Sequence, residues 1–119
     1  MLPQAATGKL LANLALAVSA QGLREALDLG HAAGLESEDI LSMLDSTGLA
    51  FIKNMKAPLH PRRTRHHPGD FSADAIAKDV RLMLDTADKD LPAARAALAS
   101  LEDKQRAGHG DEDFSVIFQ

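Results

Sequence analysis

The sequence predicts an all-α fold, and three observations support that prediction. Alanine and leucine dominate the 119 residues while β-branched residues are few, which favours helix by intrinsic propensity. No segment alternates apolar and polar residues as strands do, and no Gly-rich phosphate loop follows a candidate strand. Between Leu10 and Ala20 the polar residues are Asn13 and Ser19. This apolar stretch is therefore expected to be a central helix, buried on nearly all sides.

The first helix is expected to begin near Pro3, because proline is tolerated in a first turn where its missing N–H would have no partner. It should continue to about Ala33, a length of roughly 30 residues that is unusual in a globular domain. Gly34 is expected to be its left-handed C-terminal cap. Gly22 and Gly30 cost helix stability, about 1 kcal/mol each relative to alanine, and so indicate close approach of other helices.

Two short helices are expected next. Ser37 is a good N-cap for the first of them, whose apolar face would carry Ile40, Leu41 and Leu44. Leu49 to Met55 is expected to form the second, and a proline-rich loop follows it.

Two further helices complete the predicted bundle. Asp70 or Ser72 should cap the first, whose buried stripe would comprise Ile76, Val80, Met83, Leu84 and Ala87. Pro92 is expected to open the last helix, which should end before Gly108. Residues 1–119 are thus expected to form a single α-helical domain of about five helices.

Composition excludes several classes of function. The 45% hydrophobic content excludes overall disorder, and the lack of cysteine excludes disulfides, zinc–thiolate sites and a cysteine nucleophile. No apolar run approaches the roughly 20 residues of a membrane span, and the N-terminus does not resemble a signal peptide, so a cytoplasmic location is expected by default. A net charge of −4 and the scarcity of aromatic residues argue against nucleic-acid binding.

Residues 53–67 depart from this acidic balance, because they contain five lysines and arginines and no acidic residue. A phosphate or polyanion could bind there, although such a run is more often a solvated loop. His66, His67 and Asp70 lie in or beside this segment. Without cysteine or an HExxH-type spacing they do not favour metal binding, and no metal site is expected.

Two pairs of residues place polar side chains in the predicted apolar helices. Lys9 and Asn13 are four residues apart and share one helix face. A buried amide without partners costs about 1–3 kcal/mol, and a lysine desolvated beside it would release its proton more readily. Lys78 and Asp79 interrupt the later helix on directions about 100° apart. From spacing alone, simpler interpretations are available. Lys9 would be solvated, the Asn13 amide would bond nearby backbone, and Lys78 and Asp79 would form an exposed polar seam.

The order of these motifs resembles the second domain of the β-hydroxyacid dehydrogenases, a family that includes 3-hydroxyisobutyrate dehydrogenase. The matching segments are Lys9-Leu10-Leu11-Ala12-Asn13, Arg24 to Gly30, Ala33-Gly34-Leu35-Glu36, Phe71 with Lys78-Asp79, Leu91-Pro92, and Gly108 to Ser115. Order and spacing match along the whole chain, which is more specific than any single motif. Ala12 departs from the pattern, because the family usually has the first asparagine of a pair there.

The resemblance implies a fold like the C-terminal helical bundle of 6-phosphogluconate dehydrogenase, with one long central N-terminal helix. It implies NAD(P)-dependent oxidation of a small 3-hydroxy acid, or reduction of a semialdehyde or 2-oxo acid. By the match, Lys9 would be the catalytic general acid/base, Asn13, Phe71 and Asp79 would contact substrate, and Lys78 would contact the cofactor.

The family's N-terminal nucleotide-binding half has no counterpart in the sequence, so NAD or NADP would be bound mainly outside this chain. The chain alone is therefore expected to be inactive, with the residues that select the substrate and distinguish NAD from NADP lying mainly in the nucleotide-binding half. The family also implies that this half supplies most subunit contacts, and the apolar run 10–20 independently favours a homodimer. The alternative is a stand-alone α-helical dimerisation domain without enzymatic activity.

Overall fold

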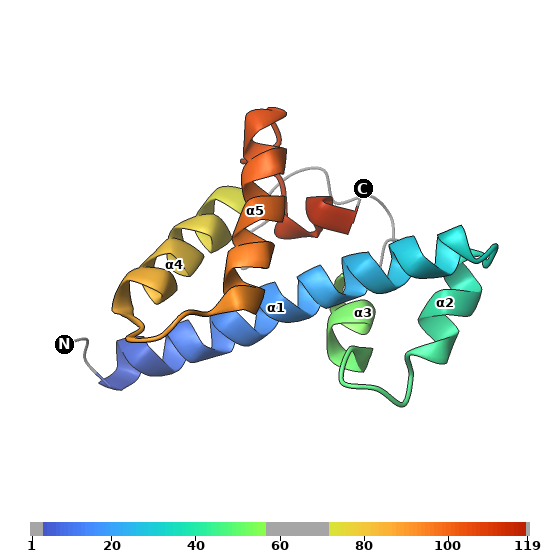
Figure 1. Cartoon of the computed structure of the whole chain (residues 1–119), viewed down its shortest axis with the longest axis horizontal. Coiled ribbons are helices and arrows are strands. Elements are labelled where there is room, and N and C mark those ends of the chain that lie inside the picture. Colours follow the sequence, from blue (N-terminus) through green and yellow to red (C-terminus); the bar gives the residue numbers. More distant parts are fainter. Residues whose placement is uncertain (1–3, 57–71, 119) are drawn as a thin grey trace.

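The computed structural model describes residues 4–56 and 72–118 (Figure 1). Their helices are α1 (Gln4–Ala32), α2 (Ser37–Met43), α3 (Ala50–Lys56), α4 (Ala73–Thr86), α5 (Pro92–Arg106) and the 3-10 helix η1 (Phe114–Phe118). Within these residues there is no strand, and an isolated bridge joins Ser72 to Asp113. The prediction of an all-α fold is confirmed.

Helix α1 is the spine of the molecule, because each of the other helices just named contacts it. Figure 1 shows α4 and α5 beside its first half and α2 and α3 beside its second half. One apolar core runs between them and includes Ala17, Ala20, Leu23, Leu27, Ile40, Ile52, Ile76, Val80, Leu101, Phe114 and Ile117. The predicted stripe of α4 is buried at Ile76, Val80 and Met83, and partly buried at Leu84 and Ala87.

Helix α1 ends as the sequence predicts. Gly34 has a φ of +91°, in the left-handed region that glycine tolerates best. The Leu35 N–H donates to the Gly30 carbonyl at 2.9 Å, and the Gly34 N–H donates to the His31 carbonyl at 3.0 Å. This pair of bonds is a Schellman motif, which satisfies carbonyl groups that a helix end otherwise leaves without partners.

Two glycines of α1, Gly22 and Gly30, face side chains from the later part of the chain. A Cβ atom at Gly30 would lie less than 3.0 Å from two carbons of Ile40 on α2, so the two helices meet there without space for a methyl group. Gly22 faces Leu49 at an ordinary contact distance of 3.4 Å. The expectation of close helix approach is confirmed at Gly30 and not at Gly22.

The two predicted caps have different outcomes. Ser72 precedes α4 and its Oγ accepts a hydrogen bond from the Ala75 N–H at 3.1 Å, which confirms the second alternative for that helix. The cap predicted at Ser37 is wrong: Glu36 occupies the N-cap position, without a side-chain cap bond. Ser37 is the first helical residue, and its hydroxyl instead bonds the His31 ring at 2.8 Å. The α1–α2 connection brings the His31 ring close to Ser37. The ring then competes with the backbone N–H groups of α2 for the Ser37 hydroxyl.

Candidate functional site

A hydrogen bond between α1 and α4 joins two of the candidate site residues. Asn13 Nδ2 donates to Asp79 Oδ2 at 2.7 Å, across 66 positions of sequence. Asn13 is only 4% exposed, while Asp79 is half-buried. A carboxylate only accepts hydrogen bonds, so this partner fixes which end of the Asn13 amide faces α4. The amide is thus bonded to a side chain, and the simpler interpretation of a bond to nearby backbone is wrong.

The register of α4 decides which of its two polar residues meets α1. Ile76, Val80 and Met83 form the buried side of α4, and Asp79 lies at the edge of that side, one helical turn from Ile76 and from Met83. Lys78 points away from the core and is exposed. The adjacent pair is therefore divided, because Asp79 joins Asn13 at the helix interface while the Lys78 ammonium remains in solvent.

Lys9 lies one helical turn before Asn13, on the same side of α1, and is exposed in this chain. The structure brings Asn13 and Asp79 into contact, and the helical spacing places Lys9 on the same side of α1 as Asn13. An exposed ammonium beside a fixed amide and a half-buried carboxylate is a set of groups that can bind and exchange a proton with a polar ligand. The burial that would tune the lysine is not supplied by the described part of this chain.

Phe71, the remaining candidate, lies outside the described residues, as do His66, His67 and Asp70. The basic segment 53–67 is described only at its start, where Lys53 forms an ion pair with Asp45. Over residues 4–56 and 72–118, no three histidine or acidic side chains gather as metal ligands would.

The apolar run of α1 is not buried on nearly all sides, which corrects the expectation from sequence. Leu11 is 62% exposed, and with Leu14, Ala15 and Val18 it forms one wall of an open groove of about 450 Å³. The other wall is the start of α5, Leu91 to Ala94. Among residues 4–56 and 72–118, α4 meets the side of α1 that carries Asn13, and the neighbouring side that carries Leu11 is left open.

One ion pair stands at the rim of this groove. The Arg95 guanidinium donates two hydrogen bonds of 2.7 Å to the carboxylate of Asp90, which lines the groove. These bonds hold the pKa of Asp90 below its ordinary value, because they favour the charged carboxylate. The same contact raises the pKa of Arg95. Both side chains are exposed, so the ion pair sets the charges at the edge of the groove and does not contribute to the core.

The pairing of Asn13 with Asp79 is the feature that sequence reasoning missed, although it named both residues. A signal was present: each is a polar residue with apolar neighbours on its helix face, in an apolar stretch of sequence.

Within residues 4–56 and 72–118, no helix combines the length and hydropathy that crossing a membrane requires.

Comparison with known proteins identifies relatives along the whole chain. The family model described as "NAD-binding of NADP-dependent 3-hydroxyisobutyrate dehydrogenase" matches residues 4–119. The probable mitochondrial 3-hydroxyisobutyrate dehydrogenase of Arabidopsis thaliana is 28% identical over 120 residues, covering 93% of this chain and 35% of the relative. The cytokine-like nuclear factor N-PAC of Anopheles gambiae is 25% identical over 115 residues, covering 92% of this chain and 20% of that protein.

Solved structures share the fold. The 3-hydroxyisobutyrate dehydrogenase of Salmonella typhimurium matches with a TM-score of 0.77 and 25% identity, covering 94% of this chain and 40% of that one. The enzyme of the same name from Mycobacterium tuberculosis matches with a TM-score of 0.78 and 21% identity, covering 94% and 41%. This chain therefore spans well under half the length of each of these relatives. The match along residues 4–119, with the shared helical fold, shows that the chain belongs to the 3-hydroxyisobutyrate dehydrogenase family.

Proposed function

We propose that this chain is the helical catalytic and oligomerisation part of an NAD(P)-dependent dehydrogenase that acts on a small 3-hydroxy acid, or on the corresponding semialdehyde or 2-oxo acid. The observation that carries the proposal is the Asn13–Asp79 hydrogen bond beside Lys9, in a chain that matches the family from residue 4 to residue 119. A dinucleotide-binding domain completes the enzyme. The domain boundaries are proposed to be those of the chain, residues 1–119.

Lys9 is proposed to exchange the proton of the reacting oxygen. NAD(P), when bound, accepts or supplies the hydride at the carbon that carries this oxygen. During oxidation of a hydroxy acid, the neutral Lys9 amine takes the hydroxyl proton while the C–O bond becomes a carbonyl. During reduction, the Lys9 ammonium stabilises the developing alkoxide and then donates the proton. Docking of the second domain would bury Lys9, which is exposed here, and tune it for this exchange.

Asn13 and Asp79 are proposed to position the reacting groups. Because Asp79 takes one N–H of the Asn13 amide, the amide oxygen faces the other way, where it can accept from the Lys9 ammonium or from a substrate hydroxyl. Lys78 fits a different role. It is exposed one residue before Asp79, so its charge can reach an anionic part of the cofactor beyond the helix interface. Phe71 is proposed to line the pocket near the nicotinamide.

The test is to join this chain to the dinucleotide-binding domain of the Salmonella 3-hydroxyisobutyrate dehydrogenase and to screen 3-hydroxy acids and semialdehydes with NAD and NADP. Turnover with at least one pair is expected, while the chain alone should neither turn over substrate nor bind NAD(P)H with submicromolar affinity, because the phosphate-binding turn supplies most cofactor contacts. A folded fusion that binds cofactor and turns over none of these compounds contradicts the proposal.

The second candidate is an assembly domain without enzymatic activity, and the open apolar groove along Leu11 favours it. One relative of this chain bears the name of a nuclear factor and not of an enzyme. The two functions are separable by experiment. An assembly domain would associate with itself as the isolated chain and would give no turnover in any fusion, whereas the dehydrogenase part gives turnover that depends on Lys9.

A further inference from the structure

The C-terminal tail completes the N-terminus of α4. The first N–H groups of a helix have no partner within the helix. Here the Ala73 N–H donates to the Glu112 carbonyl and the Asp74 N–H donates to the Gly110 carbonyl, each at 2.8 Å. Backbone atoms of residues 110–112 thus act as a cap for α4, next to the side-chain cap from Ser72. The orientation of the first turn of α4 is therefore set by a segment about 40 residues later in the chain.

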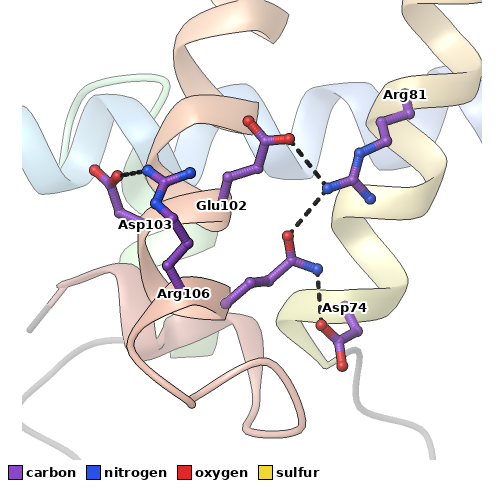
Figure 2. Close-up of polar contacts among 6 residues, drawn as sticks. Asp74, Arg81, Glu102, Asp103 and Arg106 are labelled. Atoms are coloured by element: carbon purple, nitrogen blue, oxygen red, sulfur yellow. Dashed lines mark hydrogen bonds and ion pairs between the residues drawn. The ribbon is translucent and has the colours of Figure 1, made fainter.

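Gly110 lies against Asp74 without room for a side chain. A Cβ atom at Gly110 would stand less than 3.0 Å from all three terminal atoms of the Asp74 carboxyl group. That carboxyl group is held by Gln105, whose Nε2 donates to Asp74 Oδ1 at 2.7 Å and whose Oε1 accepts from Arg81 at 3.0 Å (Figure 2). The carboxylate can move aside only by giving up this hydrogen bond, so a side chain at position 110 would disturb the contact.

The tail itself is anchored in the core. Asp113 is fully buried and its Oδ2 accepts from the Ser115 N–H at 3.1 Å, which fixes the turn into η1. Phe114 is fully buried as well and packs with the core residues of α1 and α4. The segment that caps α4 is thus connected to the centre of the molecule and cannot swing away without exposing an aromatic side chain.

We propose that residues 110–113, the tail clamp, are positioning residues for the site: they hold α4 in the register at which Asp79 meets Asn13. The role in the reaction rests on the proposed function, but the geometric claim does not. Asp79 follows Asp74 by five residues in one continuous helix, so a shift of the clamped turn is carried to Asp79. A hydrogen bond of 2.7 Å is lost once the distance between its donor and acceptor increases by about 1 Å.

The chain offers a direct probe of the clamp. It contains two asparagines, the buried Asn13 and the exposed Asn54 on α3, so labelling asparagine with ¹⁵N yields one reporting and one reference side-chain amide in NMR spectra. In the 119-residue chain, Gly110→Ala is expected to shift the Asn13 amide signals and to speed their hydrogen exchange by about tenfold or more, because the bond to Asp79 is weakened. The Asn54 signals should not change.

Two further variants separate the clamp from general destabilisation. Gly110→Ala combined with Asp74→Ala removes the atoms that clash with the new methyl group, and should restore the Asn13 signals. Gly48→Ala is the matched control, since a Cβ there meets nothing within 4 Å, and should leave them unchanged. If Gly110→Ala does not fold, Phe114→Leu decides, because it loosens the tail without a clash and should perturb the same amide less strongly. Unchanged Asn13 signals in every folded tail variant overturn the clamp.

In the two-domain fusion, Gly110→Ala should lower kcat/KM by about 10–100-fold, since a misplacement of about 1 Å at a reacting group has costs of that order. The double variant should recover most of this loss. Perturbed Asn13 signals with unchanged kcat/KM in an active fusion contradict the catalytic part of the inference. A fusion without any turnover contradicts the proposed function, and the amide measurement still decides the clamp.

Discussion

The two halves of α1 are held to the rest of the molecule by different interactions. In residues 18–32, Gly30 allows Ile40 of α2 to approach so closely that a methyl group has no room, and the helix then stops at a Schellman motif. In residues 4–17, the specific contact is the hydrogen bond from Asn13 to Asp79 of α4, and a neighbouring leucine, Leu11, remains in solvent. The second half combines close packing with a hydrogen bond from Ser100 to its Gln21, whereas the polar contact of the first half lies at the edge of an open surface.

This difference indicates where function resides. Close packing holds helices together but offers a ligand no polar group. A buried hydrogen bond to a carboxylate orients both of its partners, and it is retained at a cost in desolvation that pure packing would avoid. The half of α1 that carries the polar contact also carries Lys9 and the apolar groove, so the surface left open is the one where the proposed chemistry and association would occur.

The largest expected effect concerns Lys9. In the two-domain fusion, Lys9→Ala should lower kcat by about 10²–10⁴, the usual loss for a general acid/base, with a much smaller change in substrate affinity. Lys9→Arg should not restore the rate, because arginine does not release a proton near neutral pH. Steady-state kinetics measure both variants, with the exposed Lys89→Ala as control. A kcat within about tenfold of the parent would make Lys9 structural.

Self-association of the isolated chain is expected to depend on Leu11 and not on Leu29, although both leucines of α1 are exposed. The isolated chain is proposed to be a homodimer through the open side of α1, so light scattering at tens of micromolar should give twice 12.7 kDa. Leu11→Glu should return the chain to monomer, because it places a charge in the groove region. Leu29→Glu is the matched control at the other end of α1, where the leucine is 74% exposed, and should remain dimeric. A monomeric parent chain rejects this interface.

The polar contact is testable by its stability. Asn13→Ala should lower the free energy of unfolding by about 1.5–3 kcal/mol, since the lost hydrogen bond has a charged acceptor. Urea denaturation measures the change, and a double-mutant cycle with Asp79→Ala isolates the pair. Ser100→Ala removes a neutral bond to Gln21 between α5 and α1 and should cost about 0.5–1.5 kcal/mol. Equal costs at both sites would show that the charge of Asp79 contributes nothing.

Two glycines of α1, Gly30 in the packed half and Gly8 in the other half, should change stability in opposite directions when replaced by alanine. Gly30→Ala should destabilise by about 1–2 kcal/mol, because the clash with Ile40 exceeds the gain in helix propensity. Gly8→Ala, where a Cβ meets no atom within 4 Å, should stabilise by about 0.5–1 kcal/mol. Thermal unfolding monitored by circular dichroism compares the two. Stabilisation by both substitutions would mean that α2 can shift away from α1 at no cost.

The smallest expected effect is the pH dependence of the Asp90–Arg95 pair. The hydrogen bond from Arg95 lowers the pKa of Asp90 from its ordinary 3.8, so the pair stabilises the fold above that value. The contribution is lost as the pH falls through the lowered pKa and the carboxylate takes up a proton. Arg95→Gln should therefore reduce the Tm slightly near pH 7 and leave it unchanged at a pH well below the lowered pKa. A difference that persists in acid would assign the loss to packing.

Much of the fold could be predicted from local sequence. The five α-helices of the described residues, the glycine stop at Gly34 and the proline start of α5 depend on interactions within a few residues, and these were predicted correctly. The cap at Ser72 was one of two predicted alternatives. The cap at Ser37 was not predicted correctly, because its hydroxyl bonds a side chain from the preceding helix. The helix η1 was not foreseen either, since five residues are too few to show a period and its burial depends on contacts with α1, α4 and α5.

For the candidate site, sequence alone determined the kinds of side chain, their order and the family that they resemble. Only the tertiary structure decided that Asp79 bonds Asn13 while the adjacent Lys78 faces solvent, and that the apolar run of α1 keeps one side open. The physical reason is the distance along the sequence over which each kind of interaction acts. Helix propensity and caps act over one turn of the chain, so the sequence displays them directly. The direction of a side chain at a helix interface, and the capping of α4 by the tail, depend on how residues far apart in sequence pack together.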